Sequence, residues 1–132
     1  MSQEARSLYR RLWRAGHAAV SNAAPAKYIF RRKLRDGFNE NLSASPDQCP
    51  ILFSRAHNTL LFLDQAARRR GLEHKVIKNL CQMGIYHQKY AERPPFWNRK
   101  LKPHQHKLHA ASYDGYYRTI EMLNESLGVF LR

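Results

Sequence analysis

The chain has 132 residues, which is enough for one domain with a modest core and an appendage but too few for two large domains. Its 23 Lys and Arg residues outnumber its 10 Asp and Glu residues, and the formal net charge of +13 predicts an acidic partner: nucleic acid, an anionic membrane or an acidic protein. No apolar run approaches the length of a membrane-spanning helix. The two cysteines, Cys49 and Cys81, lack metal-type spacing and are too few for a disulfide scaffold, so we expect reduced, buried or half-buried thiols.

Three amphipathic helices are predicted in the first half of the chain. The first covers about residues 3–20, and the second covers about residues 26–41, directly after Pro25. The segment Ser45-Pro46-Asp47-Gln48 matches a capping box and predicts the start of the third helix. Pro50 lies late for that register and would move the start by a turn. The third helix should end at Gly71, because three arginines in its last turn followed by glycine are the usual stop signal.

Two further helices are predicted in the second half, over about residues 72–90 and 112–131. Between them lies a basic strap, residues 93–109, which carries Pro94, Pro95 and Pro103 and should not form a regular element. No alternation typical of strands competes with these helices. We therefore predict an all-α fold with a three-helix bundle in residues 1–71 and a two-helix extension, joined by the strap, in residues 72–132.

The first two helices each combine an apolar stripe with a basic stripe. Leu8-Tyr9-Arg10 lies near the start of the first helix, where basic residues recur at every fourth position. The second helix holds Leu34-Arg35-Asp36-Gly37-Phe38, a hydrophobic-basic-x-x-Phe pattern. This combination resembles the LYR-motif (complex I LYR-like) family of small mitochondrial three-helix proteins, which bind an acyl carrier protein. Gly16 and the run from Leu34 to Asn41 look most like the branch that joins this carrier to the mitochondrial large ribosomal subunit.

The resemblance implies a site made of two parts. Basic residues and a tyrosine would contact the acidic recognition helix of the acyl carrier protein: Arg6, Tyr9, Arg10, Arg14, Arg31 and Arg35. Apolar residues between the helices would receive the acyl chain: Leu8, Leu12, Phe30, Leu34, Phe38 and Leu60. No cofactor would be bound directly, because the acyl-phosphopantetheine is carried by the partner. We expect no catalytic residue, no small-molecule substrate and no metal ligand, since His104, His106 and His109 fit no standard zinc pattern.

The strap is a candidate RNA-binding segment because its basic residues alternate with aromatic residues. Cations would contact phosphates and the aromatic rings would stack on exposed bases, which assigns this role to Arg93, Phe96, Trp97, Arg99, Lys100, Lys102 and Lys107. The alternative is that Phe96 and Trp97 pack back onto the bundle. The two arrangements are compatible, since the aromatic residues can anchor the strap while its cations face RNA.

The first twenty residues contain five Arg or His side chains and a single acidic one, Glu4, which resembles an amphipathic matrix-targeting segment. Together with this segment, the resemblance to LYR-motif proteins implies a non-enzymatic adaptor of the mitochondrial matrix that binds acylated acyl carrier protein and docks it on a large assembly. Mitochondrial ribosomal proteins and rRNA are the expected partners. One alternative is a subunit, assembly factor or iron–sulfur delivery adaptor of a respiratory complex. Another is a small helical RNA-binding protein with an accidental Leu-Tyr-Arg.

Overall fold

The computed structural model describes residues 2–41, 43–92, 102–111 and 113–132, and all regular secondary structure in these residues is helical. The helices, in chain order, are α1 (Gln3–Ala19), α2 (Ala26–Asn41), α3 (Cys49–Arg68), α4 (Leu72–Glu92), α5 (Pro103–Ala111) and α6 (Asp114–Leu127). No strand occurs in the described ranges, so the predicted all-α class is confirmed.

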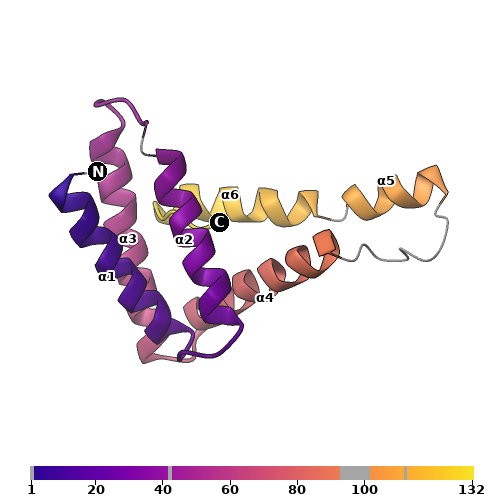
Figure 1. The fold of residues 1–132 in the computed structure, drawn as a ribbon, viewed down its shortest axis with the longest axis horizontal. Coiled ribbons are helices and arrows are strands. Elements are labelled where there is room, and N and C mark those ends of the chain that lie inside the picture. Colours follow the sequence, from indigo (N-terminus) through magenta and orange to yellow (C-terminus); the bar gives the residue numbers. More distant parts are fainter. Residues whose placement is uncertain (1, 42, 93–101, 112) are drawn as a thin grey trace.

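The first three helices form an upright bundle, and the remaining helices project from it as an arm (Figure 1). Helix α1 packs against both α2 and α3, and α4 packs against both α2 and α3 near the base of the bundle. Figure 1 shows α4 running outward and α6 returning above it, so that the chain ends beside α2. The bundle and the arm share one hydrophobic core, because Ile77 and Leu80 of α4 belong to the same buried cluster as Leu8 and Leu12 of α1.

Helix α1 begins where its sequence provides a cap. The Ser2 side chain accepts a hydrogen bond from the Ala5 backbone N–H at 3.2 Å, which satisfies one of the donors left free at a helix start. Four residues of the apolar face are buried, with exposed fractions between 1% and 8%: Leu8, Leu12, Ala15 and Ala19. The predicted bounds and inward face of the first helix are therefore confirmed to within a residue.

The capping box predicted at Ser45–Gln48 is wrong. These residues form a turn in which the Gln48 N–H donates to the Ser45 carbonyl at 3.0 Å, and the Gln48 side chain makes no capping bond. Helix α3 begins at Cys49 with Pro50 in its first turn. Because a proline in the first turn loses no intrahelical hydrogen bond, Pro50 marks the start more strongly than Pro46 does.

The second half of the chain differs from the prediction at two places. Part of the strap is helical: α5 begins at Pro103, which fits the first helical position, so the described extension contains three helices instead of two. The last helix ends at Leu127 instead of continuing to residue 131. Gly128 has a φ of 61°, and this left-handed conformation turns the chain back so that Val129 and Leu131 reach the core.

A glycine allows α1 and α2 to approach closely. A Cβ placed on Gly16 would overlap the ring of Phe30 on α2, and Phe30 in turn packs against the shared core. Any larger residue at position 16 would therefore push this ring aside and separate the two helices.

We expect Gly16→Ala to lower the free energy of unfolding by about 1–3 kcal/mol, because the new methyl group collides with Phe30. Urea denaturation of the purified chain measures this change. Gly115→Ala on α6 is the matched control: nothing lies within 4 Å of its added Cβ, so it should be neutral or stabilising by up to about 1 kcal/mol. Equal stability of the two variants would contradict the proposed contact.

Candidate functional site

A cavity of about 430 Å³ lies between the helices of the bundle. This volume falls in the range of about 300–1,000 Å³ that is usual for ligand sites in proteins. Most of its wall is apolar and comes from α1, α2, α3 and α4, and Phe130 and Leu131 complete it. On α3 the lining extends from Cys49 to Leu63, a length of roughly 21 Å at 1.5 Å per residue, so the cavity is elongated along the helices.

One end of the cavity lies where α1 and α3 begin and α2 ends. Ser2 and Ala5 at the start of α1, Asn41 at the end of α2 and Cys49 at the start of α3 all line it. Ser2 is exposed, and the other three are partly exposed. The opposite end is closed by Ile77, Leu80 and Cys81 of α4, which are only 3% to 5% exposed. The cavity therefore has an accessible end with polar side chains and a buried end with mostly apolar ones, where Lys33 lies near Cys81.

Five of the six residues predicted for the acyl-chain pocket line this cavity: Leu8, Leu12, Phe30, Leu34 and Phe38. Leu60 does not line it, although it is buried in the adjoining core. The difference follows from the helical period, because Ala56, Thr59 and Leu63 occupy the cavity side of α3 and Leu60 is turned about 100° away from Thr59. Tyr9 does not line the cavity, but its ring packs edge-to-face against that of Phe38, with 5.0 Å between the ring centroids.

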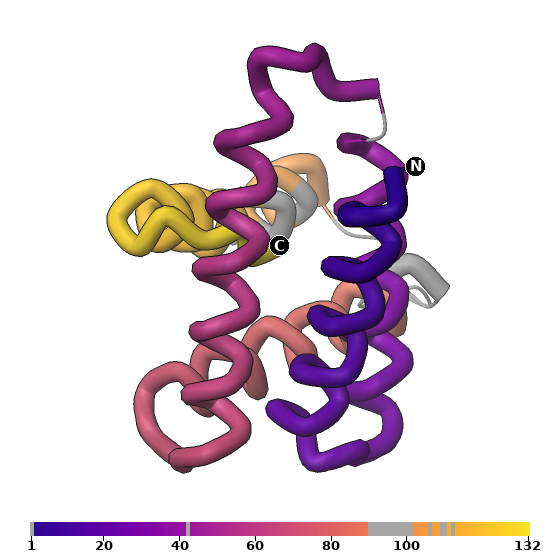
Figure 2. The backbone as a smooth tube through the Cα atoms, turned by 90° about the vertical axis from the view of Figure 1, so that its left-hand side faces the viewer, coloured from indigo at the N-terminus to yellow at the C-terminus, as the bar shows by residue number. Residues whose placement is uncertain are grey.

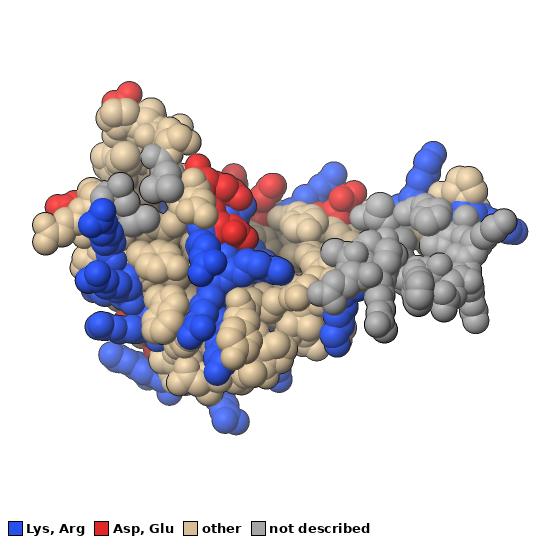
Figure 3. Space-filling view, in the orientation of Figure 1, with Lys and Arg blue, Asp and Glu red and all other residues tan. Residues whose placement is uncertain are grey.

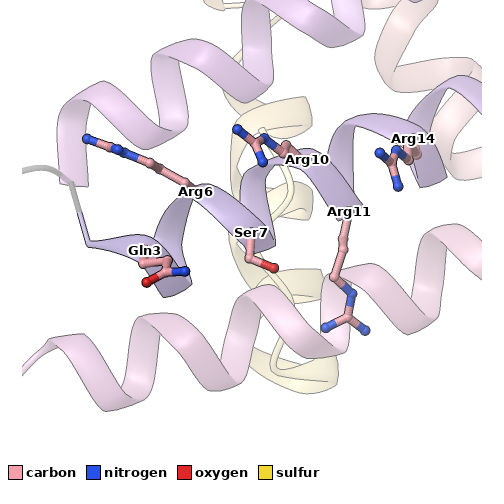
Figure 4. Close-up of a pocket in the computed structure, with 6 residues that line it drawn as sticks. All are labelled: Gln3, Arg6, Ser7, Arg10, Arg11 and Arg14. Carbon is pink, nitrogen blue, oxygen red and sulfur yellow. The ribbon is translucent and has the colours of Figure 1, made fainter.

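Arginine side chains form a basic row along the outer face of α1. Gln3, Arg6, Ser7, Arg10, Arg11 and Arg14 border an open hollow of about 550 Å³ on this single helix (Figure 4). Arg6, Arg10 and Arg14 rise from one side of α1 and Arg11 from the other. All four arginines are exposed, as is Arg35 on α2. Figure 3 shows Lys and Arg side chains gathered over α1 and α2 on this face.

Arg31, also predicted for the carrier surface, is held by contacts within the chain. Its Nε donates to His17 Nε2 at 3.1 Å, and its guanidinium lies 4.9 Å from the centre of the Trp13 ring. Because Nε2 accepts this bond, the His17 proton resides on Nδ1, which donates to Asn22 Oδ1 at 3.1 Å. Arg31 therefore fastens α2 to the end of α1 and is less available to a partner than its exposed neighbours.

Few Lys and Arg side chains of the described part of the chain form close ion pairs within the protein. Among the side chains that the structure describes, the only ion pair within 4.0 Å joins Arg132 to Glu40, with an N–O distance of 2.6 Å. An exposed pair of this kind contributes little to stability. The arginine row on α1 is therefore free to meet carboxylates or phosphates of another molecule.

Two titratable side chains, Cys81 and Lys33, line the cavity, and burial shifts the pKa of both. Burial raises the pKa of the Cys81 thiol to about 11, and the nearby Lys33 only partly opposes this. Burial also lowers the pKa of Lys33 from its ordinary value, and the cations Arg132 and Arg32 add to the effect. Cys81 is therefore a protonated thiol at neutral pH and not a nucleophile. Sequence reasoning missed Lys33 and Cys81 as lining residues, because neither belongs to the apolar stripe that defined the predicted pocket.

The predicted RNA-binding residues lie mostly outside the described ranges, since Arg93, Phe96, Trp97, Arg99 and Lys100 fall in residues 93–101. Lys102 immediately precedes α5 and Lys107 lies on it, and both are exposed. Within the described part of the chain, no group of three or more His, Cys, Asp or Glu residues could hold a metal ion. None of the helices, as far as they are described, has the length and apolar character needed to cross a bilayer.

The fold and site thus define a small basic all-helical protein with an elongated apolar cavity. The chain is 29% identical over 135 residues to a "UPF0593 mitochondrial protein" of Schizosaccharomyces pombe. The alignment covers 99% of this chain and 100% of the relative, so the similarity extends over the whole fold. The chain therefore has a distant homologue of equal size that is named as mitochondrial. No protein-family model matches the chain, and no solved structure matches it significantly.

We expect Cys81 to resist alkylation in the folded protein. At pH 8 a thiol with a pKa of about 11 has roughly one-hundredth the thiolate of one at its ordinary 9.0, and burial excludes the reagent further. In a Cys49→Ser variant, iodoacetamide should modify Cys81 at least about a hundredfold more slowly than in the same chain unfolded in urea. The rate should rise steeply as the pH approaches 11. Equal rates in the folded and unfolded chains would mean that the thiol is accessible.

Proposed function

We propose that the protein is a non-enzymatic adaptor of the mitochondrial matrix that binds an acylated acyl carrier protein and holds its fatty acyl chain in the cavity. The observation that carries this proposal is the joint placement of the cavity and the basic row on α1. Leu8 and Leu12 face the cavity, while Arg6, Arg10 and Arg14 lie on the outer side of the same helix. The resemblance to LYR-motif proteins and the mitochondrial name of the homologue point in the same direction.

The two surfaces meet at the amino end of α1. Arg6 directly follows Ala5, which lines the accessible end of the cavity together with Ser2. An acidic carrier helix on the arginine row would therefore bring its acyl-phosphopantetheine arm to that end. The arm would pass from the polar end toward Ile77 and Leu80. Each methylene buried in this way contributes about 0.8 kcal/mol, so the acyl chain supplies most of the affinity.

The arginine contacts serve a different purpose from the cavity. Exposed charges accelerate and orient association more than they strengthen it, because water and salt screen them. Bidentate bonds from guanidinium groups to carboxylates or to the phosphate of the arm would fix the direction of approach. The basic row is thus proposed to select the carrier, and the cavity is proposed to retain its acyl chain.

We expect the charge reversal Arg10→Glu to reduce co-purification of acyl carrier protein at least about tenfold, because it places an anion at the centre of the basic row. Intact mass spectrometry of the purified complex measures the carrier and its acyl group together. Arg118→Glu is the matched control, since Arg118 is exposed on α6, away from the basic row. Retention of the carrier by Arg10→Glu, or its loss with both variants, would contradict the proposed interface.

The large assembly on which the carrier is docked is proposed to be the large subunit of the mitochondrial ribosome. The support is electrostatic: the chain has a formal net charge of +13, and only one close ion pair occurs among the described side chains. A phosphate-rich surface is the natural complement of such a charge, because binding releases condensed counterions. The strap and the exposed cations Lys102 and Lys107 are the proposed contacts.

We expect the wild type to co-sediment with large ribosomal subunits from mitochondrial lysate, with binding that weakens as salt rises. Replacing Arg93, Arg99, Lys100, Lys102 and Lys107 with glutamine should abolish co-sedimentation while acyl carrier protein is still bound. Co-migration of the wild type with a respiratory complex, and not with the ribosome, would favour that complex as the partner. RNA binding that survives Arg10→Glu, without any carrier bound by the wild type, would instead indicate a simple RNA-binding protein.

A further inference from the structure

The segment Gly128–Arg132 crosses the open side of the bundle between α2 and α3. After the left-handed turn at Gly128, Val129 and Leu131 are buried, with exposed fractions of 2% and 6%. In Figure 2, α3 stands on one side and α1 with α2 on the other, and the end of the chain comes between them. The segment therefore bridges two helices that face each other across the cavity.

Hydrogen bonds from three side chains hold the segment in place. The Asn124 side chain binds both sides of Leu131, since its Oδ1 accepts from the Leu131 N–H at 2.7 Å and its Nδ2 donates to the Leu131 carbonyl at 2.8 Å. Thr59 Oγ1 accepts from the Phe130 N–H at 2.8 Å and donates to the Arg55 carbonyl at 2.7 Å. Asn58 Nδ2 donates to the Gly128 carbonyl at 3.0 Å. These bonds satisfy backbone groups of a segment that has no helical or strand partners of its own.

The same segment forms part of the cavity wall. Phe130, Leu131 and Arg132 all line the cavity, and the Phe130 ring lies 3.5 Å from the position that a Cβ on Gly37 would take. Gly37 belongs to α2 and also lines the cavity, so the wall and α2 meet there with little space to spare. Of the residues that hold the segment, Asn124 and Asn58 do not touch the cavity.

We propose that residues 128–132 form a fixed wall that sets the size of the fatty acyl chain which the cavity accepts, an inference that rests on the proposed function. The ligand class is a saturated acyl chain on a carrier protein. Phe130 and Leu131 are the specificity-determining residues, because their side chains occupy volume that a longer chain would otherwise fill. Asn124 is a positioning residue, because it holds the backbone of Leu131 without lining the cavity.

The experiment compares affinities of the full chain for acyl carrier protein charged with octanoyl, dodecanoyl or hexadecanoyl groups. The measured quantity is the ratio of the hexadecanoyl to the octanoyl affinity. Phe130→Ala should raise this ratio at least about tenfold, because every further methylene that becomes buried increases affinity about fourfold. Asn124→Ala should raise it at least about threefold by releasing the wall. Gly37→Ala, which adds one methyl group to the cavity lining beside Phe130, should lower it about fourfold.

Ser126→Ala is the matched control, because Ser126 is exposed on α6 and its hydroxyl bonds only the nearby Leu123 carbonyl. Its ratio should equal that of the wild type. Should Phe130→Ala fail to fold, Asn124→Ala and Gly37→Ala decide the question by their opposite directions. If the wild type binds the acylated carriers but the ratios of these two variants stay within about twofold of its own, residues 128–132 do not set the acyl-chain length. A wild type that binds none of the carriers would overturn the proposed function itself.

Discussion

The separation of α2 from α3 is the constraint on which the rest of the structure depends. Helix α1 packs against both on one side and α4 packs against both at the base, so the two helices cannot close on each other. The space left between them is lined by partly buried apolar side chains such as Leu34, Phe38 and Phe53. An apolar ligand in this space would contact the lining side chains of both helices. A ligand that binds only the folded state would also stabilise the fold.

Helix α1 carries the basic row on its outer face and part of the cavity lining on its inner face. The α1 sequence puts leucines and alanines inward and arginines outward at the same four-residue interval, so both surfaces are fixed by a single helical register. Arg31 shows why a basic residue is not in itself a binding residue: its guanidinium is occupied by His17 and Trp13. A periodic row of basic residues can therefore include both cations that hold the fold together and cations that are exposed to a partner.

The sequence predicted the elements that local periodicity defines and missed those that tertiary contacts define. The bounds of α1 and α2 and the inward face around Leu8 follow from spacing alone. The end of α6 does not, because Leu123, Leu127 and Leu131 continue a helical spacing and only the conformation of Gly128 interrupts it. Cys81 lines the cavity because α4 crosses α2, a packing that no local pattern contains. Whether the lining residues receive an acyl chain stays a prediction.

The double hydrogen bond from Asn124 to Leu131 joins α6, the returning helix of the arm, to the wall of the cavity. Mechanical linkage of this kind is symmetrical in free energy. A ligand in the cavity and a partner on α6 that favoured different positions of residues 128–132 would weaken each other's binding by the same factor. Residues 128–132 follow α6 directly in the chain, so the cavity wall and α6 are coupled both covalently and through the Asn124–Leu131 hydrogen bonds.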